Sequence, residues 1–404
     1  MLLKSEIEQA FLKQQEQFLA MPAQEVSRFV DYSNFFKSGM IEVISGIRRA
    51  GKSVLLQQIR KSISEKSVFM NFEDPRIFNF EIGDFPKLDE IIGDSTSYYF
   101  FDEIQNVEHW EQYIRQLHDR GKKVFITGSN ASLLSKDLGT RLTGRYIHHE
   151  LFPFSFDEFK TFHQLSNSVS SFESYLLKGG FPEFNKTEQV ESLQPLFKDI
   201  LLRDIAIRYG IRNTRSLLEI AFFLISTIGK EHTYTGLKKA FSFGSVNTVS
   251  DYLQWMEDAY LFFYLPRFSW SAKSSISSPR KVYSIDTALA RLSSLSYSKD
   301  SGRLFENAVF LHLRRQNLRI SYFRENKECD FITFKDNKCH QVIQVCTEIT
   351  SDNKKRETEG LLEAMNFFDK NEGFIITQHQ KDELILDGKH ILLVPAHDFF
   401  QNIL

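Results

Sequence analysis

The stretch GIRRAGKS, residues 46 to 53, follows the pattern Gly, four variable residues, Gly, Lys and Ser of a phosphate-binding loop. Residues 40 to 44 before it, Met-Ile-Glu-Val-Ile, are mostly apolar and rich in β-branched side chains. Residues 54 to 59 after it carry apolar side chains at helical spacing. The loop therefore lies between a strand and a helix, which is the context that a phosphate-binding loop requires.

The residue types in this loop suit a bound phosphate. Gly46 and Gly51 let the backbone turn its N–H groups inward, and the helix N-terminus adds a partial positive charge. Lys52 can reach the β- and γ-phosphates of a nucleotide, and Ser53 can place its hydroxyl on Mg²⁺. The alternative is a chance glycine-rich turn, which the flanking elements disfavour. The predicted cofactor-binding residues of this stretch are Gly46, Ile47, Arg48, Arg49, Ala50, Gly51, Lys52, Ser53 and Val54.

Two acids form a second motif. The apolar residues 98 to 101 read as a strand, and Asp102 and Glu103 follow at its carboxyl end, where ligands bind in open α/β sheets. We expect Asp102 to orient Mg²⁺ through its waters and Glu103 to polarise the water that attacks the γ-phosphate. The alternative is a strand that ends in two solvated acids, and the nearby phosphate loop favours the catalytic interpretation.

Four further polar residues are candidates with open alternatives. Ser129 and Asn130 follow the next strand and either sense the nucleotide or cap a helix that starts near residue 131. Arg141 and Arg145 lie in GTRLTGRY and are either arginine fingers that enter a neighbouring subunit or structural surface arginines. A finger acting in trans would require a homo-oligomer.

The first region, residues 1 to 160, alternates strands with helices, a pattern typical of a parallel, doubly wound α/β sheet. An amphipathic helix over residues 3 to 20 is expected to pack beside its core. The expected strands after the loop cover residues 67 to 72, 97 to 101, 123 to 127 and 145 to 151.

The motifs together resemble a known family. GIRRAGKS, NFEDPR at 71 to 76, FFDEIQ at 100 to 105 and ITGSNASLLSKDLGTRLTGR at 126 to 145 are similar to the prokaryotic AAA-like ATPases of the AAA and STAND neighbourhood. That family pairs an N-terminal P-loop ATPase with a further C-terminal region. The resemblance implies a core sheet of strand order 5-1-4-3-2 and a preference for adenine over guanine.

The resemblance also implies a role for one further residue. It implies that Asn71, at the end of the second strand, holds Glu103 idle until a partner binds. A strand-end turn residue is the other interpretation of Asn71. The sequence shows no clear second-sensor arginine of the AAA+ lid type, which argues against ring-forming behaviour of that kind.

The middle region, residues 161 to 270, reads as helical. A short helix at 235 to 241, a turn at 242 to 244, a longer helix at 245 to 259 and a strand at 260 to 268 resemble a winged helix-turn-helix. This resemblance suggests DNA binding, since such domains place their second helix in the major groove.

The charges of the longer helix argue against that mode of binding. Residues 245 to 259 contain no Lys or Arg and carry Asp251, Glu257 and Asp258, whereas DNA binding depends on neutralised phosphates. We therefore predict a packing or interaction module with, at most, weak non-specific DNA binding. The cations expected to make that contact are the pairs Lys238-Lys239 and Arg280-Lys281.

The last region, residues 271 to 404, resembles the restriction-endonuclease-like fold. Asp330 lies where that family has a metal-binding Asp, and Glu306 lies on a preceding helix. The family then needs an acid, one spacer and a Lys, but this sequence has Gln344 and Cys346 at those positions. A divalent cation needs several oxygen ligands, so the sequence predicts an inactive, nuclease-like domain.

The composition argues against several other classes of protein. The 404 residues carry a formal net charge of -2, so no bulk attraction to nucleic acid is expected. Three unevenly spaced cysteines indicate a reducing compartment and no disulfide framework. The N-terminal stretch lacks the apolar region of a signal peptide, and no apolar run is long enough to span a bilayer. We expect a cytoplasmic protein without a membrane partner.

These observations predict a Mg²⁺-dependent ATPase whose ligands are ATP and Mg²⁺. The predicted catalytic residues are Glu103, Lys52, Arg141 and Arg145. In the favoured interpretation the nucleotide state switches binding to a protein or nucleic-acid partner. The alternative is a nucleic-acid-processing ATPase with an active C-terminal nuclease, which the residue at position 346 disfavours.

Overall fold

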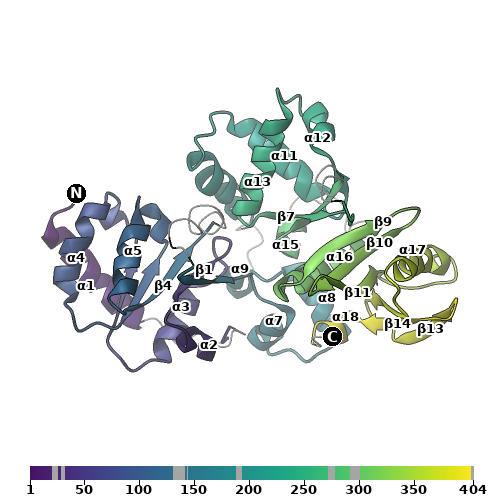
Figure 1. The fold of residues 1–404 in the computed structure, drawn as a ribbon, viewed down its shortest axis with the longest axis horizontal. Coiled ribbons are helices and arrows are strands. Elements are labelled where there is room, and N and C mark those ends of the chain that lie inside the picture. Colours follow the sequence, from purple (N-terminus) through teal and green to yellow (C-terminus); the bar gives the residue numbers. More distant parts are fainter. Residues whose placement is uncertain are drawn as a thin grey trace. The chain divides into compact units, whose positions relative to one another are not determined.

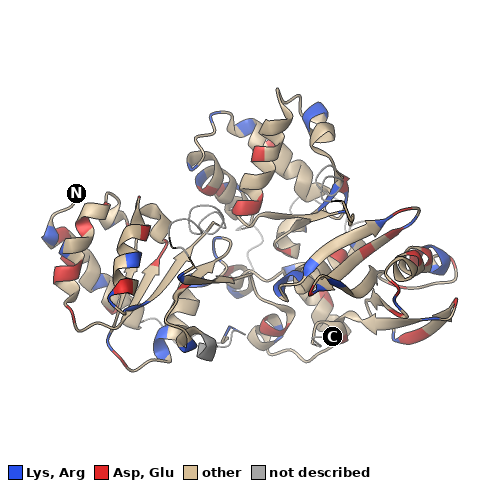
Figure 2. Ribbon diagram, viewed as in Figure 1, with Lys and Arg blue, Asp and Glu red and all other residues tan. Residues whose placement is uncertain are grey.

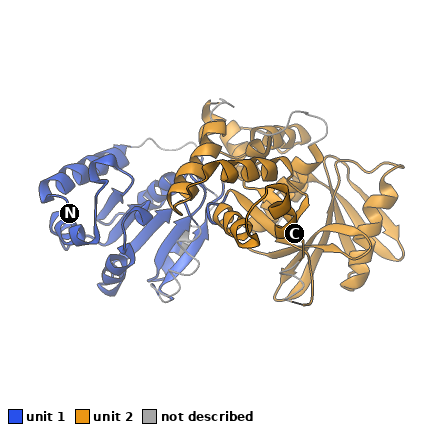
Figure 3. Cartoon of the chain, turned by 90° about the horizontal axis from the view of Figure 1, so that it is seen from above, with its two compact units in different colours: residues 1–152, 258–260 blue, residues 153–257, 261–404 orange. Residues whose placement is uncertain are grey.

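The computed structural model describes residues 1–20, 26–28, 32–130, 142, 144–187, 193–271, 278–291 and 301–401. The chain forms two compact units (Figure 3). Unit 1 comprises Met1–Phe152 and Asp258–Tyr260, and unit 2 comprises Pro153–Glu257 and Leu261–Leu404. The division into three domains at residues 160 and 270 stays a prediction.

Unit 1 is built on a five-stranded, all-parallel sheet (Figure 1). Its order, β2-β3-β4-β1-β5, confirms the expected order 5-1-4-3-2 read from the other edge, and with it the α/β fold class. Strands of such a sheet are covered on both faces, so they read as nearly continuous apolar runs. The strands are β1 (Ile41–Ser45), β2 (Ser67–Asn71), β3 (Tyr98–Asp102), β4 (Lys123–Gly128) and β5 (Tyr146–Glu150).

Helices cover the two faces of this sheet with separate cores. On one face α1, α4 and α5 pack against side chains that include Val43, Met70 and Phe101. On the other face α3 packs against the alternate side chains, among them Phe100 and Phe125. Side chains alternate along a strand, so neighbouring residues serve opposite cores. The helices are α1 (Lys4–Ala20), α2 (Tyr32–Lys37), α3 (Lys52–Lys61), α4 (Phe85–Ile92) and α5 (Trp110–Asp119), with short 3₁₀ turns at Pro75–Ile77, Ile82–Asp84 and Ile104–Asn106.

The register of the sheet brings the polar strand ends together. Ser45 lies beside Gly128, and Asn71 lies beside Asp102. Phe101 pairs with Ile126, so the residues after β3 and β4 leave the sheet at the same edge. The phosphate loop leaves β1 at this edge as well.

The first part of unit 2 is mainly helical. A small antiparallel sheet of order β6-β8-β7 closes it, and α11, α12 and α13 precede its last two strands. The elements expected at 235 to 241 and 245 to 259 correspond to α12 and α13. The bounds are α7 (Phe156–His163), α8 (Val169–Lys178), α9 (Pro182–Thr187), α10 (Leu193–Asp199), a π-helix (Ile200–Ile207), α11 (Thr214–Ser226), β6 (Glu231–His232), α12 (Tyr234–Ala240), α13 (Val246–Asp258), β7 (Phe262–Pro266), β8 (Arg280–Ser284) and α15 (Thr287–Arg291).

The C-terminal part of unit 2 holds a six-stranded mixed sheet of order β13-β14-β12-β11-β10-β9. The sequence of this region predicts strands at 320 to 323, 331 to 334, 341 to 345 and 373 to 377, and all four are present. The hairpin of β13 and β14 was not anticipated. The bounds are α16 (Ser301–Arg315), β9 (Arg319–Arg324), β10 (Glu328–Lys335), β11 (Lys338–Val345), α17 (Lys354–Phe367), β12 (Glu372–Thr377), β13 (Asp382–Leu386), β14 (Lys389–Pro395) and α18 (Ala396–Phe399).

Over the described ranges, no helix combines the length and the apolar character that crossing a membrane requires.

Candidate functional site

The phosphate loop has the backbone that its glycines predict. Gly51 caps α3 with a φ of 97°, and Arg49 also has a positive φ of 67°. A Cβ on Gly46 would lie 2.1 Å from the Leu151 carbonyl oxygen. Larger residues at positions 46 and 51 would therefore displace or strain the loop.

Lys52, the first residue of α3, points into the loop. Its side chain is buried, and its Nζ donates to the carbonyl oxygens of Gly46 at 3.0 Å and Ile47 at 3.3 Å. The same Nζ lies 3.3 Å from Oε1 of Glu103. The structure thus brings the lysine of the first motif to the glutamate of the second, 51 positions later in the sequence.

Ser53 and Asp102 also meet. The Ser53 hydroxyl donates to Oδ2 of Asp102 at 2.6 Å, and the Thr127 hydroxyl donates to Oδ1. Thr127 accepts in turn from the Glu103 backbone N–H at 3.0 Å. Thr127 lies at the end of β4, in the same polar stretch as the candidates Ser129 and Asn130, and it joins the site through these contacts with Asp102 and Glu103.

The electrostatic environments of the two acids differ. Burial and the charge of Glu103 raise the pKa of Asp102, against the hydrogen bonds from Ser53 and Thr127. Burial alone would raise the pKa of Glu103 as well, but the Lys52 charge and the Gln105 hydrogen bond outweigh it and hold that pKa below its usual range. Opposite pKa shifts in the adjacent Asp102 and Glu103 fit two separate roles. Glu103 also has a φ of 52°, a rare conformation that is typical of functional positions.

The donor set fits a nucleotide with Mg²⁺. A hydroxyl and a carboxylate oxygen 2.6 Å apart are hard ligands of the kind that Mg²⁺ takes beside phosphates. The Ser129 hydroxyl oxygen is buried at the end of β4, and among the described residues it has no hydrogen-bond partner. A phosphate oxygen at this edge of the sheet would satisfy it. Asn130 is buried as well.

Asn71 and Glu103 each have local partners in the structure. The Asn71 side chain accepts from the backbone N–H of Glu73 at 2.8 Å, as a turn residue does. Glu103 is instead engaged by Lys52 and Gln105. No hydrogen bond joins Asn71 to Glu103 among the described residues, so the expectation that Asn71 holds Glu103 idle stays a prediction.

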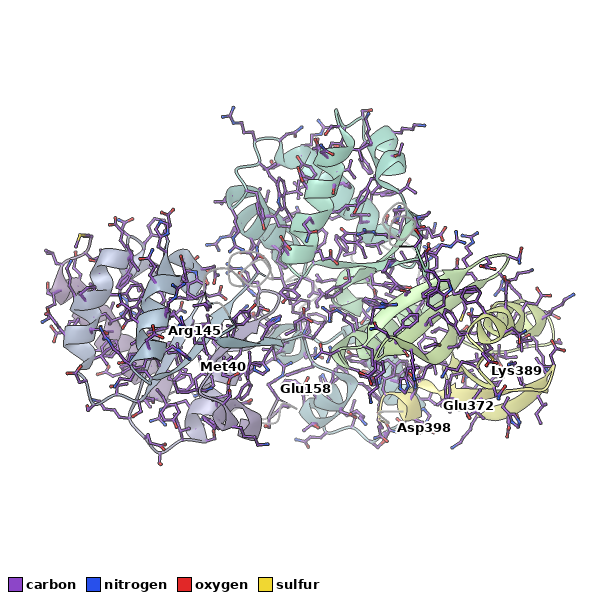
Figure 4. All side chains as sticks on the ribbon, in the orientation of Figure 1. Met40, Arg145, Glu158, Glu372, Lys389 and Asp398 are labelled. Carbon is purple, nitrogen blue, oxygen red and sulfur yellow. The ribbon has the colours of Figure 1, made fainter. Side chains whose placement is uncertain are left out.

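The two candidate arginine fingers are placed differently. Arg141 lies outside the described residues. Arg145 (labelled in Figure 4) directly precedes β5, and its carbonyl accepts from the Ile41 N–H at the start of β1. β1 extends from there to Ser45, so Arg145 lies about 15 Å from the loop of its own chain, at about 3.3 Å per residue. Its guanidinium lies 3.9 Å from Asp119.

The cations proposed to contact DNA differ in their exposure to solvent. Lys239 is exposed, and Lys238 is half-buried. Lys281 is 2% exposed, so the expectation that it contacts phosphate is wrong: its ammonium is turned inward. α13 carries Asp251 and no Lys or Arg along its length (Figure 2).

Lys281 lies at the centre of a buried charged cluster in unit 2. Its Nζ lies 3.0 Å from Glu306 Oε1, 2.8 Å from Glu328 Oε1 and 3.0 Å from Asp330 Oδ1. The Tyr283 hydroxyl also donates to Glu306 at 2.6 Å. The three protons of the ammonium therefore each face a carboxylate. We call this set of Lys281, Glu306, Glu328 and Asp330 the lysine cluster.

Neighbouring backbone and amide groups complete the cluster. The Val345 N–H donates to Asp330 Oδ2 at 3.0 Å, and Gln344 is held by Glu357 at 3.0 Å. The Cys346 thiol donates to the carbonyl of Glu348. Over the described ranges no group of His, Cys, Asp and Glu side chains is arranged to hold a metal ion. A lysine thus occupies the space between Glu306 and Asp330.

Comparison with known proteins bears on both units. A family model described as an AAA domain matches residues 38–160, and a model described as a domain of unknown function matches residues 169–299. The uncharacterized protein MJ1544 of Methanocaldococcus jannaschii is 36% identical over 352 residues, covering 80% of this chain and 78% of the relative. An uncharacterized protein of Haemophilus influenzae is 30% identical over 386 residues, covering 89% and 94%.

Solved structures are similar at lower identity. The Walker-type ATPase PaBY2304 of Pyrococcus abyssi is 13% identical with a TM-score of 0.41, covering 68% of this chain and 98% of that chain. AMPPCP-bound DnaA from Aquifex aeolicus is 14% identical with a TM-score of 0.30, covering 59% and 90%. The family assignment rests on the sequence relatives and on the match to the AAA-domain model. The chain therefore belongs to the same family as these proteins from Methanocaldococcus jannaschii and Haemophilus influenzae, and its residues 38–160 form an AAA-type P-loop domain.

Proposed function

We propose that the chain binds ATP with Mg²⁺ and hydrolyses it, and that the nucleotide state switches its binding to a protein or nucleic-acid partner. The observation that carries the proposal is the convergence of Lys52, Ser53, Asp102 and Glu103 at one edge of a parallel sheet. In this arrangement each of the four has a role in phosphoryl transfer to water.

Each residue of the site has a separate role in this proposal. Lys52 would neutralise charge on the β- and γ-phosphates, and Ser53 and Asp102 would hold Mg²⁺, which would supply further positive charge for phosphoryl transfer. Glu103 orients the attacking water and accepts its proton. Ser129 and Asn130 lie at the end of β4, where contact with the γ-phosphate would report its presence.

The ion pair between Lys52 and Glu103 suggests how binding and hydrolysis are linked. The ammonium holds the pKa of Glu103 down, which makes this carboxylate a weak base. When Lys52 turns toward a phosphate, the Glu103 carboxylate loses its ion-pair partner and can accept a hydrogen bond from water. Nucleotide binding would then activate the base.

The lysine cluster bears on the competing nuclease interpretation. A metal nuclease needs carboxylates that are free to bind a divalent cation, whereas Glu306 and Asp330 both contact the Lys281 ammonium at 3.0 Å. This contact favours a structural role for the cluster. We therefore place the proposed enzymatic activity in unit 1.

Glu103→Gln tests the proposal. The variant should bind ATP and Mg²⁺ like the wild type but release phosphate about 10²–10⁴-fold more slowly, the usual range for a general base. Glu108→Gln, an exposed glutamate five positions later, is the matched control and should hydrolyse at the wild-type rate. Equal rates for Glu103→Gln and the wild type would exclude Glu103 as the base, and a parallel loss of ATP binding would make it structural.

The partner can be sought with the same variant. Glu103→Gln charged with ATP should accumulate in the ATP-bound form and retain the partner through washing. Glu108→Gln, which turns ATP over, should release it. Equal retention by both variants, with and without ATP, would contradict the switch.

A further inference from the structure

Tyr260 is a buried residue with an uncommon backbone conformation. It lies between the end of α13 (Val246–Asp258) and the start of β7 (Phe262–Pro266). Its φ is 58°, and it is 2% exposed. Bulky side chains rarely adopt a positive φ, and such conformations persist only where the surrounding structure holds them. The contacts of Tyr260 therefore indicate what holds it.

The Tyr260 hydroxyl contacts the strand that enters the phosphate loop. It lies 2.5 Å from the Ser45 hydroxyl, which in turn lies 2.8 Å from Nε2 of His148 on β5. Ser45 is fully buried at the end of β1 and directly precedes Gly46. Residues 258 to 260 belong to unit 1, whereas the chain before and after them belongs to unit 2.

The start of the loop cannot shift independently of Ser45. The Ser45 carbonyl accepts from the Leu151 N–H at 2.7 Å, and the Gly46 N–H donates to the Gly128 carbonyl at 3.3 Å. Gly46 is so close to Leu151 that a Cβ would collide with it. A change in the Tyr260 hydroxyl contact would therefore be transmitted along a tightly packed backbone to the loop.

We propose that Tyr260 is a positioning residue of the phosphate loop, acting through Ser45, and that it links nucleotide occupancy of the loop to α13. The proposal rests on the proposed ATP function and adds the residue through which that site is connected to the helical part. Tyr260 touches no phosphate; it fixes where the loop begins. Because Tyr260 follows α13 after one residue, a displacement at Ser45 alters the C-terminal end of that helix.

The test compares two tyrosines that lie four positions apart. Tyr260→Phe removes the hydroxyl that contacts Ser45. Tyr264→Phe is the matched control, because the Tyr264 hydroxyl is buried and no described residue hydrogen-bonds to it. ATP affinity is measured by calorimetry on the full chain, and thermal stability is recorded in parallel. We expect Tyr260→Phe to weaken ATP binding by about 2- to 10-fold, the range of one neutral hydrogen bond, and Tyr264→Phe to leave it unchanged.

A double-variant cycle separates positioning from general destabilisation. Ser45→Ala, which removes the contacts with both Tyr260 and His148, should weaken binding at least as much, and adding Tyr260→Phe to it should cause no further loss, because the contact with Tyr260 is already gone. Amide exchange of α13 should change on addition of ATP in the wild type and should not change in Tyr260→Phe. A nucleotide-induced change of equal size in both proteins would leave Tyr260 a purely structural residue and overturn the proposal.

The remaining outcomes separate this inference from the proposed function. If the wild type binds ATP and Tyr260→Phe matches it in affinity and exchange, only the role of Tyr260 is refuted. If the wild type fails to bind ATP with Mg²⁺, the proposed function and this inference both fail. Additive losses in the double variant would also contradict action through Ser45.

Discussion

Replacing Lys281 by Met should destabilise unit 2 severely. The substitution keeps most of the side-chain volume and removes the only cation among the four residues of the lysine cluster. It leaves Glu306, Glu328 and Asp330 facing one another at a site where the lysine is 2% exposed. Breaking a buried ion pair by removing one partner costs roughly 3–5 kcal/mol. For a unit of this size that corresponds to a fall in melting temperature of roughly 6–20 °C.

Thermal unfolding followed by circular dichroism measures this loss. Lys327→Met is the control, because Lys327 pairs with Glu359 at 2.8 Å but is 55% exposed, and exposed pairs contribute little. Adding Glu306→Gln and Asp330→Asn to Lys281→Met should recover part of the lost stability by removing the unpaired charges. A melting temperature for Lys281→Met within a degree or two of the wild type would refute the view that the ammonium holds the cluster together.

Three further results are expected. Burial raises the pKa of Glu306 from its usual 4.5 to about 7, so the contribution of Glu306 to stability is full below pH 4.5 and is lost as the pH rises through 7. Glu306→Gln should flatten this part of the stability profile. An unchanged profile would show that other groups cause the loss of stability. Arg145→Ala should slow hydrolysis only at protein concentrations where the chain assembles, and a rate per chain that is independent of concentration in both proteins would exclude a finger acting in trans. Reversing the charges of Lys238 and Lys239 should abolish any weak, salt-sensitive DNA binding, whereas Asn247→Ala should not; tight binding at physiological salt that is lost in Asn247→Ala would restore α13 as a base-reading helix.

The phosphate loop was predictable because its chemistry is contiguous in sequence. The glycines, Lys52 and Ser53 lie within eight residues, and the apolar runs beside them identify a strand and a helix. Parallel strands end at a common edge, so Asp102 and Glu103 could be placed near the loop without coordinates. The structure confirms this convergence through the contact of Ser53 with Asp102.

The contacts that the sequence did not predict join distant segments. The sequence places Lys281 beside Arg280 and predicts a surface cation, yet its partner Asp330 lies 49 positions away. The pattern of residues 260 to 268 predicts a strand that starts at Tyr260, but the contact of Tyr260 with Ser45 spans 215 positions. No local pattern encodes such pairings, because they depend on how separate elements pack. Buried polar residues in apolar surroundings were the available signal, and they do not identify their partners.

Calorimetric titration of ATP with Mg²⁺ into the full chain tests the central claim most directly. The wild type should bind one ATP per chain. Lys52→Ala should lose this binding, because it removes the charge that offsets the β- and γ-phosphates. Lys61→Ala, an exposed lysine at the end of the same helix, should retain it. Equal ATP affinity in Lys52→Ala and the wild type would contradict the assignment of the phosphate loop as the nucleotide site.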